Sequence, residues 1–205
     1  MKNPWEEIPL DDYENHMRLD SVRQLQAMNE MMKDQFGDYS VSTVMILGIA
    51  GGNGLEHIEK GRFKKIYGID VNTSYLDEVN RRYSDISDVL ECICIDLTKD
   101  VRYLPPADLV IANLLIEYIG YECFQKVIQQ VRPKYVSCII QINIEDGWVS
   151  DSPYLHVFDR LEEVHCQMDE MSLKSAMEGI GYHAGKTLEY LLPNGKKLVK
   201  MDFIL

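Results

Sequence analysis

A group of glycines and one isolated acidic residue have the types and spacing of a nucleoside-binding site. Gly48, Gly51 and Gly54 follow the apolar run 44–47, and Asp70 comes 22 positions after Gly48 (70 − 48 = 22) at the end of a second apolar run. Glycines let a chain turn sharply after a buried strand and let backbone N–H groups approach an anionic ligand. A carboxylate at the end of the neighbouring strand can accept both ribose hydroxyl protons. The pattern predicts a site for a cofactor that contains a nucleoside.

Short apolar runs alternate with helical patterns after about residue 42. This alternation indicates an α/β fold with a doubly wound, mostly parallel sheet, whose strands and helices position these residues. We expect strands at Thr43–Ile49, Lys65–Asp70, Leu90–Ile95, Ala107–Asn113 and Tyr135–Ile142. We expect helices at Asn53–Lys60, Ser74–Ser84, Tyr121–Val131 and Asp169–Gly179. The final runs, Gly181–Leu192 and Lys196–Leu205, are joined by a Pro-Asn-Gly turn with no helix between them, which predicts an antiparallel hairpin.

The length of 205 residues favours one domain, spanning 1–205. Apolar residues recur at helical spacing over 11–36, which predicts a helical segment that either simply covers the sheet or acts as a functional lid. We therefore expect an N-terminal helical lid at 1–40 and a core at 41–205. Segment 145–167 is long and aromatic for a strand-to-helix connection, so we expect it to form a substrate pocket.

Composition argues against several partners. Acidic residues outnumber basic ones 33 to 21, a net charge of −12, so we expect no binding to nucleic acid or to membranes. The charged N-terminus and the lack of a long apolar window lead us to expect a cytoplasmic protein. Five cysteines without framework spacing are expected to be reduced, and we expect no metal site. The oligomeric state is undetermined by these patterns.

The motifs resemble those of the class I S-adenosylmethionine-dependent methyltransferases over roughly residues 40–205. Leu47–Gly52 is similar to the first motif, whose backbone holds the methionine end of the cofactor, and 107–119 resembles the fourth strand and the loop that faces the sulfonium and the acceptor. The hairpin resembles the reversed seventh strand of that family, which implies a seven-stranded sheet. The cofactor-binding residues implied by the resemblance are Gly48, Ala50, Gly51, Gly52, Asp70, Val71, Asp96, Leu97, Asn113 and Leu114.

The chain also departs from the pattern of that family. The family often has an acidic residue where Ile46 stands, a glycine where Ala50 stands and a histidine where Tyr118 stands. A Pro-Gly-Gly turn is common where this chain has 132–134.

The resemblance implies methyl transfer from S-adenosylmethionine to a small-molecule acceptor, and two alternatives accompany it. The spacing of Gly48, Gly51 and Gly54 also fits an NAD(P)-dependent oxidoreductase, and Tyr182 and Lys186 have the spacing of the catalytic pair of such enzymes. We expect those two residues in a strand, however, where they would not lie one helical turn apart. The other alternative is a non-catalytic protein that binds S-adenosylmethionine.

Methyl transfer depends mainly on positioning and needs no universal catalytic residue. A hydroxyl or thiol acceptor needs a group within hydrogen-bond reach to take its proton. The candidates are Tyr13, His16, Glu117, Tyr118, His156 and His165. Position favours two clusters, the helix start at 12–17 and the aromatic segment 145–167, which includes Trp148.

Overall fold

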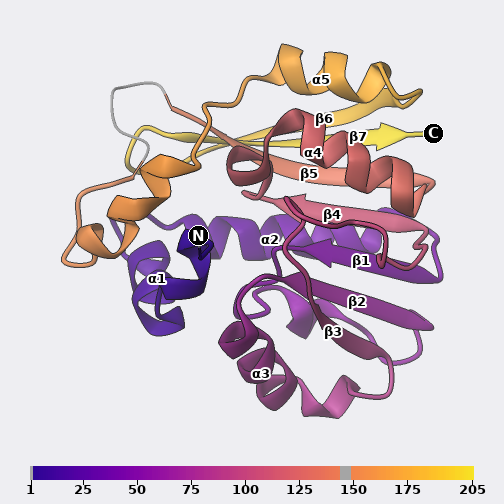
Figure 1. Ribbon diagram of the computed structural model, residues 1–205, viewed down its shortest axis with the longest axis horizontal. Helices are drawn as coiled ribbons and strands as arrows, with labels where there is room; N and C mark the ends of the chain where they lie inside the picture. Colours follow the sequence, from indigo (N-terminus) through magenta and orange to yellow (C-terminus); the bar gives the residue numbers. More distant parts are fainter. Residues whose placement is uncertain (1, 144–148) are drawn as a thin grey trace.

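The computed structural model describes residues 2–143 and 149–205, and a seven-stranded sheet runs through its centre (Figure 1). The spatial order of the strands is β3-β2-β1-β4-β5-β7-β6. β7 is antiparallel to both β5 and β6, and the other neighbouring pairs are parallel. The strands are β1 (Thr43–Leu47), β2 (Lys65–Asp70), β3 (Leu90–Cys94), β4 (Leu109–Asn113), β5 (Tyr135–Ile142), β6 (His183–Leu191) and β7 (Lys197–Ile204). The predicted fold class is confirmed.

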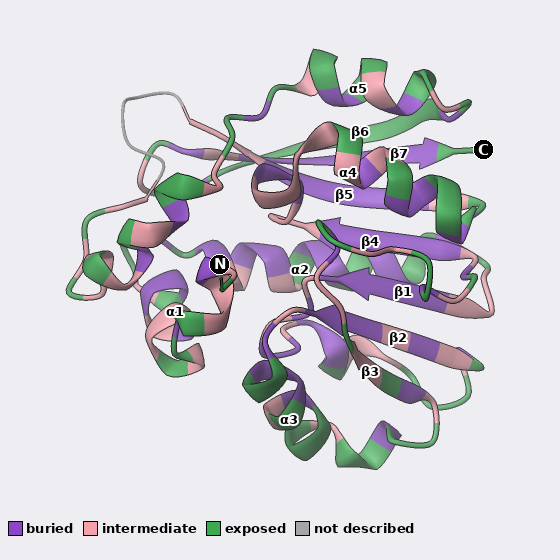
Figure 2. Cartoon of the chain, viewed as in Figure 1, coloured by how far each residue is buried: buried purple, intermediate pink, exposed green. Residues whose placement is uncertain are grey.

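Helices cover both faces of this sheet (Figure 1). Because side chains alternate along a strand, Met45 and Leu47 of β1 pack with α4 and α5, whereas Val44 and Ile46 pack with α2 and α3. The α-helices are α1 (Leu10–Arg18), α2 (Gln24–Gly37), α3 (Thr73–Arg82), α4 (Ile116–Val131) and α5 (Glu170–Glu178). The 3-10 helices are η1 (Pro4–Glu7), η2 (Leu55–His57), η3 (Ser84–Ile86) and η4 (Leu155–Glu163). Figure 2 shows the resulting buried central strands between partly exposed helices.

The register of the parallel strands brings the predicted site residues to one edge of the sheet. Leu47, the last residue of β1, pairs with Ile69 of β2 and with Ala112 of β4. Gly48, Asp70 and Asn113 each follow one of these paired residues directly. The sheet thus assembles at a single edge residues that are up to 65 positions apart in sequence (113 − 48 = 65).

The helix predicted at Asn53–Lys60 is wrong. The structure has only the three-residue turn η2 there, preceded by Gly54 in the left-handed region at φ 90°. The side chain of Asn53 donates to the carbonyl of Leu25 in α2 at 3.0 Å, which ties this segment to α2 instead of leaving it free to form a helix. No helix dipole therefore points at the glycine turn from this segment.

The segment 11–36, predicted as helical, forms the two helices α1 and α2. The break comes at 19–23, where Arg23 adopts a left-handed conformation at φ 51° and Val22 is buried in the turn. The helix predicted at Tyr121–Val131 also begins earlier than expected, at Ile116. Gly120, at φ 74°, separates a first turn from the main part of α4, so that Glu117 lies on a short turn near the end of β4.

The predicted pocket segment 145–167 is described only from residue 149 onward, and Trp148 lies outside the described residues. Phe158 and Leu161 of η4 are buried against Ile8, so this segment packs on the N-terminal one. The division into a lid at 1–40 and a core at 41–205 stays a prediction.

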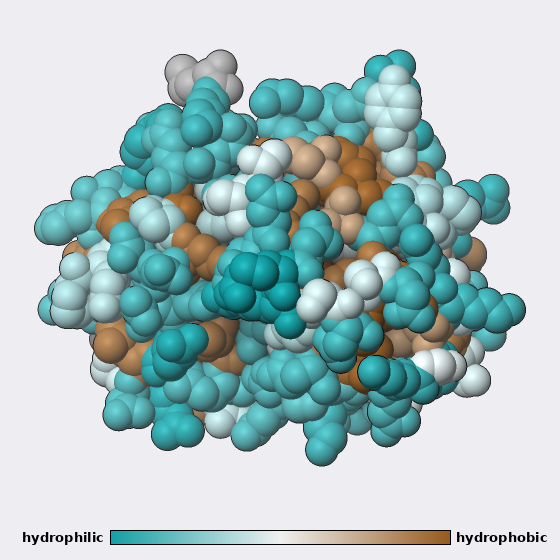
Figure 3. Space-filling model, turned by 90° about the horizontal axis from the view of Figure 1, so that it is seen from below, coloured by the Kyte–Doolittle hydropathy of each residue, from teal (hydrophilic) through white to brown (hydrophobic). Residues whose placement is uncertain are grey.

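The outer surface is mostly polar. Figure 3 views the molecule from below, where hydrophilic side chains cover most of the face and hydrophobic ones form separate patches between them. Within residues 2–143 and 149–205, no helix has the length and apolar character needed to span a bilayer.

Candidate functional site

A cavity of about 340 Å³ lies at the edge of the sheet where β1, β2 and β4 end. Eight of the ten predicted cofactor residues line it, namely Gly48, Ala50, Asp70, Val71, Asp96, Leu97, Asn113 and Leu114. The cavity therefore collects residues from four predicted segments that are distant in sequence. The edge between β1 and β4 is also the point where the strand order reverses, which is where open α/β sheets bind ligands.

Asp70 is 9% exposed and fastens the glycine turn from the neighbouring strand. Its Oδ2 accepts the N–H of Ala50 at 2.9 Å, and its Oδ1 accepts the N–H of Asn72 at 2.9 Å. Burial raises the pKa of Asp70, and these backbone donors oppose the rise. Each carboxylate oxygen has a second lone pair, so the side chain retains capacity to accept hydrogen bonds from a ligand in the cavity.

The backbone N–H groups of the glycine turn are largely used within the protein. Gly48 donates to the carbonyl of Ile69 at 2.8 Å, Ala50 donates to Asp70, and Gly52 donates to Ile49 at 2.9 Å. These three N–H groups therefore already have acceptors within the protein, and they hold the turn against β2. That the backbone of the turn binds an anionic ligand group stays a prediction.

Three residues that line the cavity have left-handed backbone conformations. Gly48 has φ 69° and Ala50 has φ 45°, and Leu114 at the end of β4 has φ 53°. Left-handed conformations are costly for residues with a side chain and persist where the surrounding structure enforces them, often at functional sites. Ala50 occupies a position where the resembled family often has glycine, and its left-handed backbone explains that preference.

Asp96 and Asn113 take part in local contacts as well as lining the cavity. Partial burial raises the pKa of Asp96, but hydrogen bonds from Lys99 and Thr98 outweigh it and lower the pKa, so the group is an ionised acceptor. The side-chain amide of Asn113 exchanges hydrogen bonds with Gln35 of α2 at 2.8 and 3.0 Å. Asn113 therefore forms a fixed part of the wall between β4 and α2.

The N-terminal segment closes one side of the cavity with Trp5 and Tyr13. Asn72 donates to the carbonyl of Trp5 at 3.0 Å, and the hydroxyl of Tyr75 donates to the carbonyl of Ile8 at 2.9 Å. Burial, followed by the charge of Asp70, raises the pKa of Tyr13, which keeps its hydroxyl protonated. Tyr13 is one of the predicted candidates for the base and lines this cavity, and the function of its helix as a lid stays a prediction.

Comparison with solved structures finds the same architecture in many methyltransferases. The methyltransferase domain of a bacterial Hen1 superposes with a TM-score of 0.65 at 19% identity, covering 88% of this chain and 97% of that one. A SAM-dependent methyltransferase from Aquifex aeolicus gives 0.63 at 18% identity, covering 94% and 98%. A geranyl diphosphate methyltransferase in complex with its substrate and sinefungin gives 0.68 at 10% identity, covering 89% and 80%. No family model and no curated protein matches the sequence.

The chain has the class I methyltransferase fold. The sheet order and the reversed β7 are the shared features, and the resemblance drawn from the motifs is confirmed at the level of the fold.

Two predicted residues of the glycine turn, Gly51 and Gly52, do not line the 340 Å³ cavity. Gly52 packs against Tyr83 and is not among the residues that line the 340 Å³ cavity. A Cβ atom added at Gly52 would lie 2.6 Å from the ring of Tyr83. Gly51 faces Glu14, whose Oε1 would lie 2.1 Å from an added Cβ. Both glycines thus permit close packing of the turn against neighbouring helices.

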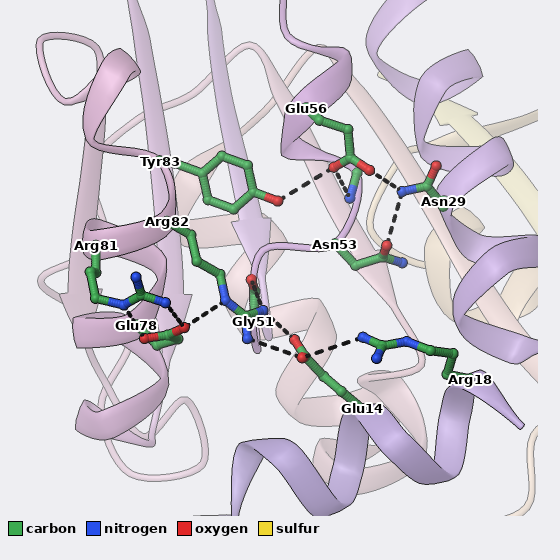
Figure 4. Close-up of polar contacts among 11 residues, drawn as sticks. Glu14, Arg18, Asn29, Gly51, Asn53, Glu56, Glu78, Arg81, Arg82 and Tyr83 are labelled. Carbon is green, nitrogen blue, oxygen red and sulfur yellow. Dashed lines mark hydrogen bonds and ion pairs between the residues drawn. The ribbon is translucent and has the colours of Figure 1, made fainter.

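A polar network joins α1 to this turn (Figure 4). Arg82 of α3 donates to both carboxylate oxygens of Glu14 and to the carbonyl of Gly51 at 3.2 Å. Arg18 lies 3.8 Å from Glu14, and Glu78 holds Arg82 from the other side at 2.8 Å. Sequence reasoning missed this contact because Glu14 and Arg82 are 68 positions apart and neither has a local pattern that indicates the other.

A second, smaller cavity of about 60 Å³ adjoins the first and shares Trp5, Tyr13, Leu114 and Tyr118 with it. Its polar lining comes from elements that are far apart in the chain. These polar residues are His16, Gln24, Glu117, Gln141, Ser150, His165 and Lys196. Five of the six predicted candidates for the base, Tyr13, His16, Glu117, Tyr118 and His165, therefore meet at this cavity.

The sixth candidate, His156, lies elsewhere. Its side chain is 90% exposed on η4 and 3.3 Å from Asp159, and it lines neither of the two cavities described above. Tyr182 and Lys186 are also remote from these cavities. The hydroxyl of Tyr182 donates to the carbonyl of Pro133 at 2.6 Å, and Lys186 lies 3.8 Å from Asp38.

Proposed function

We propose that the chain binds S-adenosylmethionine in the 340 Å³ cavity and transfers its methyl group to a small-molecule acceptor. The observation that carries this proposal is the convergence of eight residues, implied by separate motifs, on one cavity at the switch point of the sheet. Neighbours with this fold include a geranyl diphosphate methyltransferase in complex with sinefungin and a magnesium protoporphyrin IX methyltransferase with bound SAH, which supports the choice of cofactor.

The lining fits the parts of this cofactor. Asp70 presents a carboxylate at the end of β2, where the ribose hydroxyls would lie, and Val71 and Leu97 offer apolar surface for the adenine. Asp96 is an ionised acceptor beside that surface and suits an exocyclic amino group. The methionine end would extend past Gly48 and Ala50 toward the network around Glu14.

When bound, the cofactor supplies an electrophilic methyl group on a sulfonium. The residues of the chain would then do the positioning, which is the main source of rate in a direct displacement. Trp5 and Tyr13 would exclude water from the reacting atoms, since they lie over both cavities. The acceptor would approach from the second cavity, because that is the adjoining space on the side of Tyr118 and Leu114.

Binding is tested first by isothermal titration calorimetry with S-adenosylmethionine and S-adenosylhomocysteine, using NAD and NADP as controls. We expect saturable binding of the two adenosyl compounds and no response to the dinucleotides. Binding of NAD or NADP alone would contradict the proposal and favour an oxidoreductase.

Transfer is tested separately, because the same fold also serves a [4+2]-cyclase. Cofactor with an isotopically labelled methyl group is incubated with fractionated small molecules, and the label is followed into products. We expect formation of S-adenosylhomocysteine together with a labelled small molecule. Tight cofactor binding without any transfer would indicate a non-catalytic binding protein.

A further inference from the structure

The carboxyl group of Glu117 stands out among the buried polar groups. Glu117 is 3% exposed, and its Oε1 accepts the backbone N–H of Gln141 at 2.8 Å. Its Oε2 is buried and has no hydrogen-bond partner among the described residues. A buried acceptor without a donor destabilises a fold, so its presence calls for a functional explanation.

The backbone holds this carboxyl group in place from two sides. Glu117 lies on the first turn of α4, which Gly120 separates from the rest of the helix. The carbonyl of Glu117 accepts the N–H of Cys166 at 2.7 Å, which links this turn to the segment that follows η4. The side chain therefore lines the second cavity from a turn that hydrogen bonds to Gln141 and Cys166 hold in place.

We propose that the second cavity binds the methyl acceptor and that Glu117 accepts the hydrogen of its nucleophilic O–H or N–H group. The acceptor class that fits is a compact aromatic or heteroaromatic molecule with a hydroxyl or amino group. This inference rests on the proposed function, because the cofactor cavity must supply the methyl group.

The aromatic side chains that line the second cavity are the reason for proposing an acceptor with an aromatic ring. The rings of Trp5 and Tyr118 meet edge to face with centroids 4.9 Å apart, and the rings of His16 and Phe158 lie 4.8 Å apart. All four side chains line the second cavity. Aromatic rings in the lining favour a ligand that itself has a ring, the polar side chains beside them favour one that carries a polar group, and a cavity of about 60 Å³ favours a small one.

The electrostatics of the cavity support a base at Glu117. Burial raises the pKa of Glu117 to about 7, opposed by the N–H of Gln141. The basic groups around the cavity are Lys196 in the turn between β6 and β7, His16 on α1, and His165 after η4. Burial lowers the pKa of Lys196 to about 8, and burial followed by the charge of Lys196 lowers the pKa of both histidines. A carboxylate whose pKa is near the working pH is well suited to take a proton.

The step balances without another reactant. A lone pair of the acceptor oxygen or nitrogen forms a bond to the methyl carbon, and the carbon–sulfur bond breaks with its electron pair going to sulfur. The proton of the acceptor moves to the Oε2 of Glu117. The products are the methylated acceptor, S-adenosylhomocysteine and a neutral Glu117 carboxyl group, which returns its proton to solvent when the site opens.

The experiment compares phenol, aniline and toluene, which share a ring and differ in the hydrogen-bond donor. Binding is measured by calorimetry on the full chain, with and without saturating S-adenosylhomocysteine. We expect phenol and aniline to bind about tenfold more tightly than toluene, which is the usual size of one added hydrogen bond to a charged group. In Glu117→Leu we expect this preference to disappear while toluene binds as before. Glu122→Gln, an exposed acid on the same helix, is the matched control.

A second measurement covers the case in which the leucine variant does not fold. Infrared titration of the carboxyl band, assigned by its loss in Glu117→Gln, should show a lower midpoint when phenol is bound, because a donated hydrogen bond stabilises the carboxylate. Equal binding of phenol and toluene, equal weakening of both in the variant, or binding of none of the three would overturn the inference. Failure to bind S-adenosylhomocysteine would overturn the proposed function instead. In that case, the binding of phenol, aniline and toluene without cofactor would still test whether Glu117 accepts a hydrogen bond from the ligand.

Discussion

Glu14 of α1 and Arg82 of α3 form an ion pair in which the guanidinium contacts both carboxylate oxygens and the carbonyl of Gly51 (Figure 4). The pair is mostly buried, with side-chain exposures of 11% for Glu14 and 29% for Arg82. It connects α1, α3 and the glycine turn. The N-terminal helix α1 is therefore attached to the glycine turn through Arg82 and does not merely lie over it.

The first prediction concerns this pair. A double-mutant cycle with Glu14→Gln and Arg82→Met in urea unfolding should give a coupling free energy of about 1 to 2 kcal/mol, since the pair is bidentate and partly shielded from solvent. Asp100 and Arg102 are the control, because Arg102 is 78% exposed, neither residue contacts Glu14 or Arg82, and exposed pairs contribute at most about 1 kcal/mol. Equal coupling in both cycles would contradict a special role for the pair at Gly51.

The second prediction concerns Asp70. Replacing it with alanine should weaken S-adenosylhomocysteine binding by about 1 to 3 kcal/mol, the usual cost of removing a buried polar partner. Calorimetry measures the loss. Asp108→Ala is the matched control, because Asp108 also accepts two backbone N–H groups, those of Ser42 and Thr43 at 2.9 Å, but lies at the opposite end of β4. We expect the control to lose stability and keep its affinity, and unchanged affinity in Asp70→Ala would refute the ribose assignment.

The third prediction concerns Tyr13. Tyr13→Ala should reduce cofactor affinity and turnover more than it reduces the free energy of unfolding, since the side chain lines both cavities at the edge of the fold. Tyr13→Phe retains the ring and its edge-to-face contact with Trp5, so it should keep most of the affinity. Calorimetry and thermal melting of the two variants test this. A large drop in melting temperature with unchanged activity per folded molecule would show a purely structural role.

The fourth prediction concerns the pH dependence of stability. The pKa of Glu117 rises from 4.5 to about 7 on folding, so between these values the folded state binds more protons than the unfolded state. The contribution of Glu117 to the free energy of unfolding is therefore largest below about pH 4. It falls by about 3 kcal/mol in all as the pH rises to about 7. Glu117→Gln removes this loss and should be more stable than the parent near about pH 8, but not near about pH 4.

Urea unfolding at several pH values measures that difference. His16, His165 and Lys196 remain in both proteins, so their titration cancels to a first approximation when the variant is compared with the parent. A stability difference that does not change with pH would show that Glu117 titrates normally.

The sequence alone was enough to predict the parallel strands and the edge of the sheet at which their ends meet. β2 and β5 occur at the predicted bounds, because buried parallel strands appear as apolar runs that turn residues interrupt. The glycines after β1 and the acid at the end of β2 were also identified from local spacing, and parallel pairing necessarily brings the ends of such strands to one edge. Spacing therefore predicted Gly48 and Asp70 at the 340 Å³ cavity, and the resemblance to methyltransferases supplied the other six predicted residues that line it.

Only the tertiary structure decided which side chains complete the site. The helix predicted after the glycine turn is absent because Asn53 bonds to α2, and the glycine N–H groups are used by β2 and by the turn itself. The pairing of Glu14 with Arg82, and the meeting of Glu117 with Lys196 at one cavity, join residues 68 and 79 positions apart (82 − 14 = 68, 196 − 117 = 79). No local pattern records such contacts, since they depend on how helices and turns pack around the sheet and not on the order of neighbouring residues.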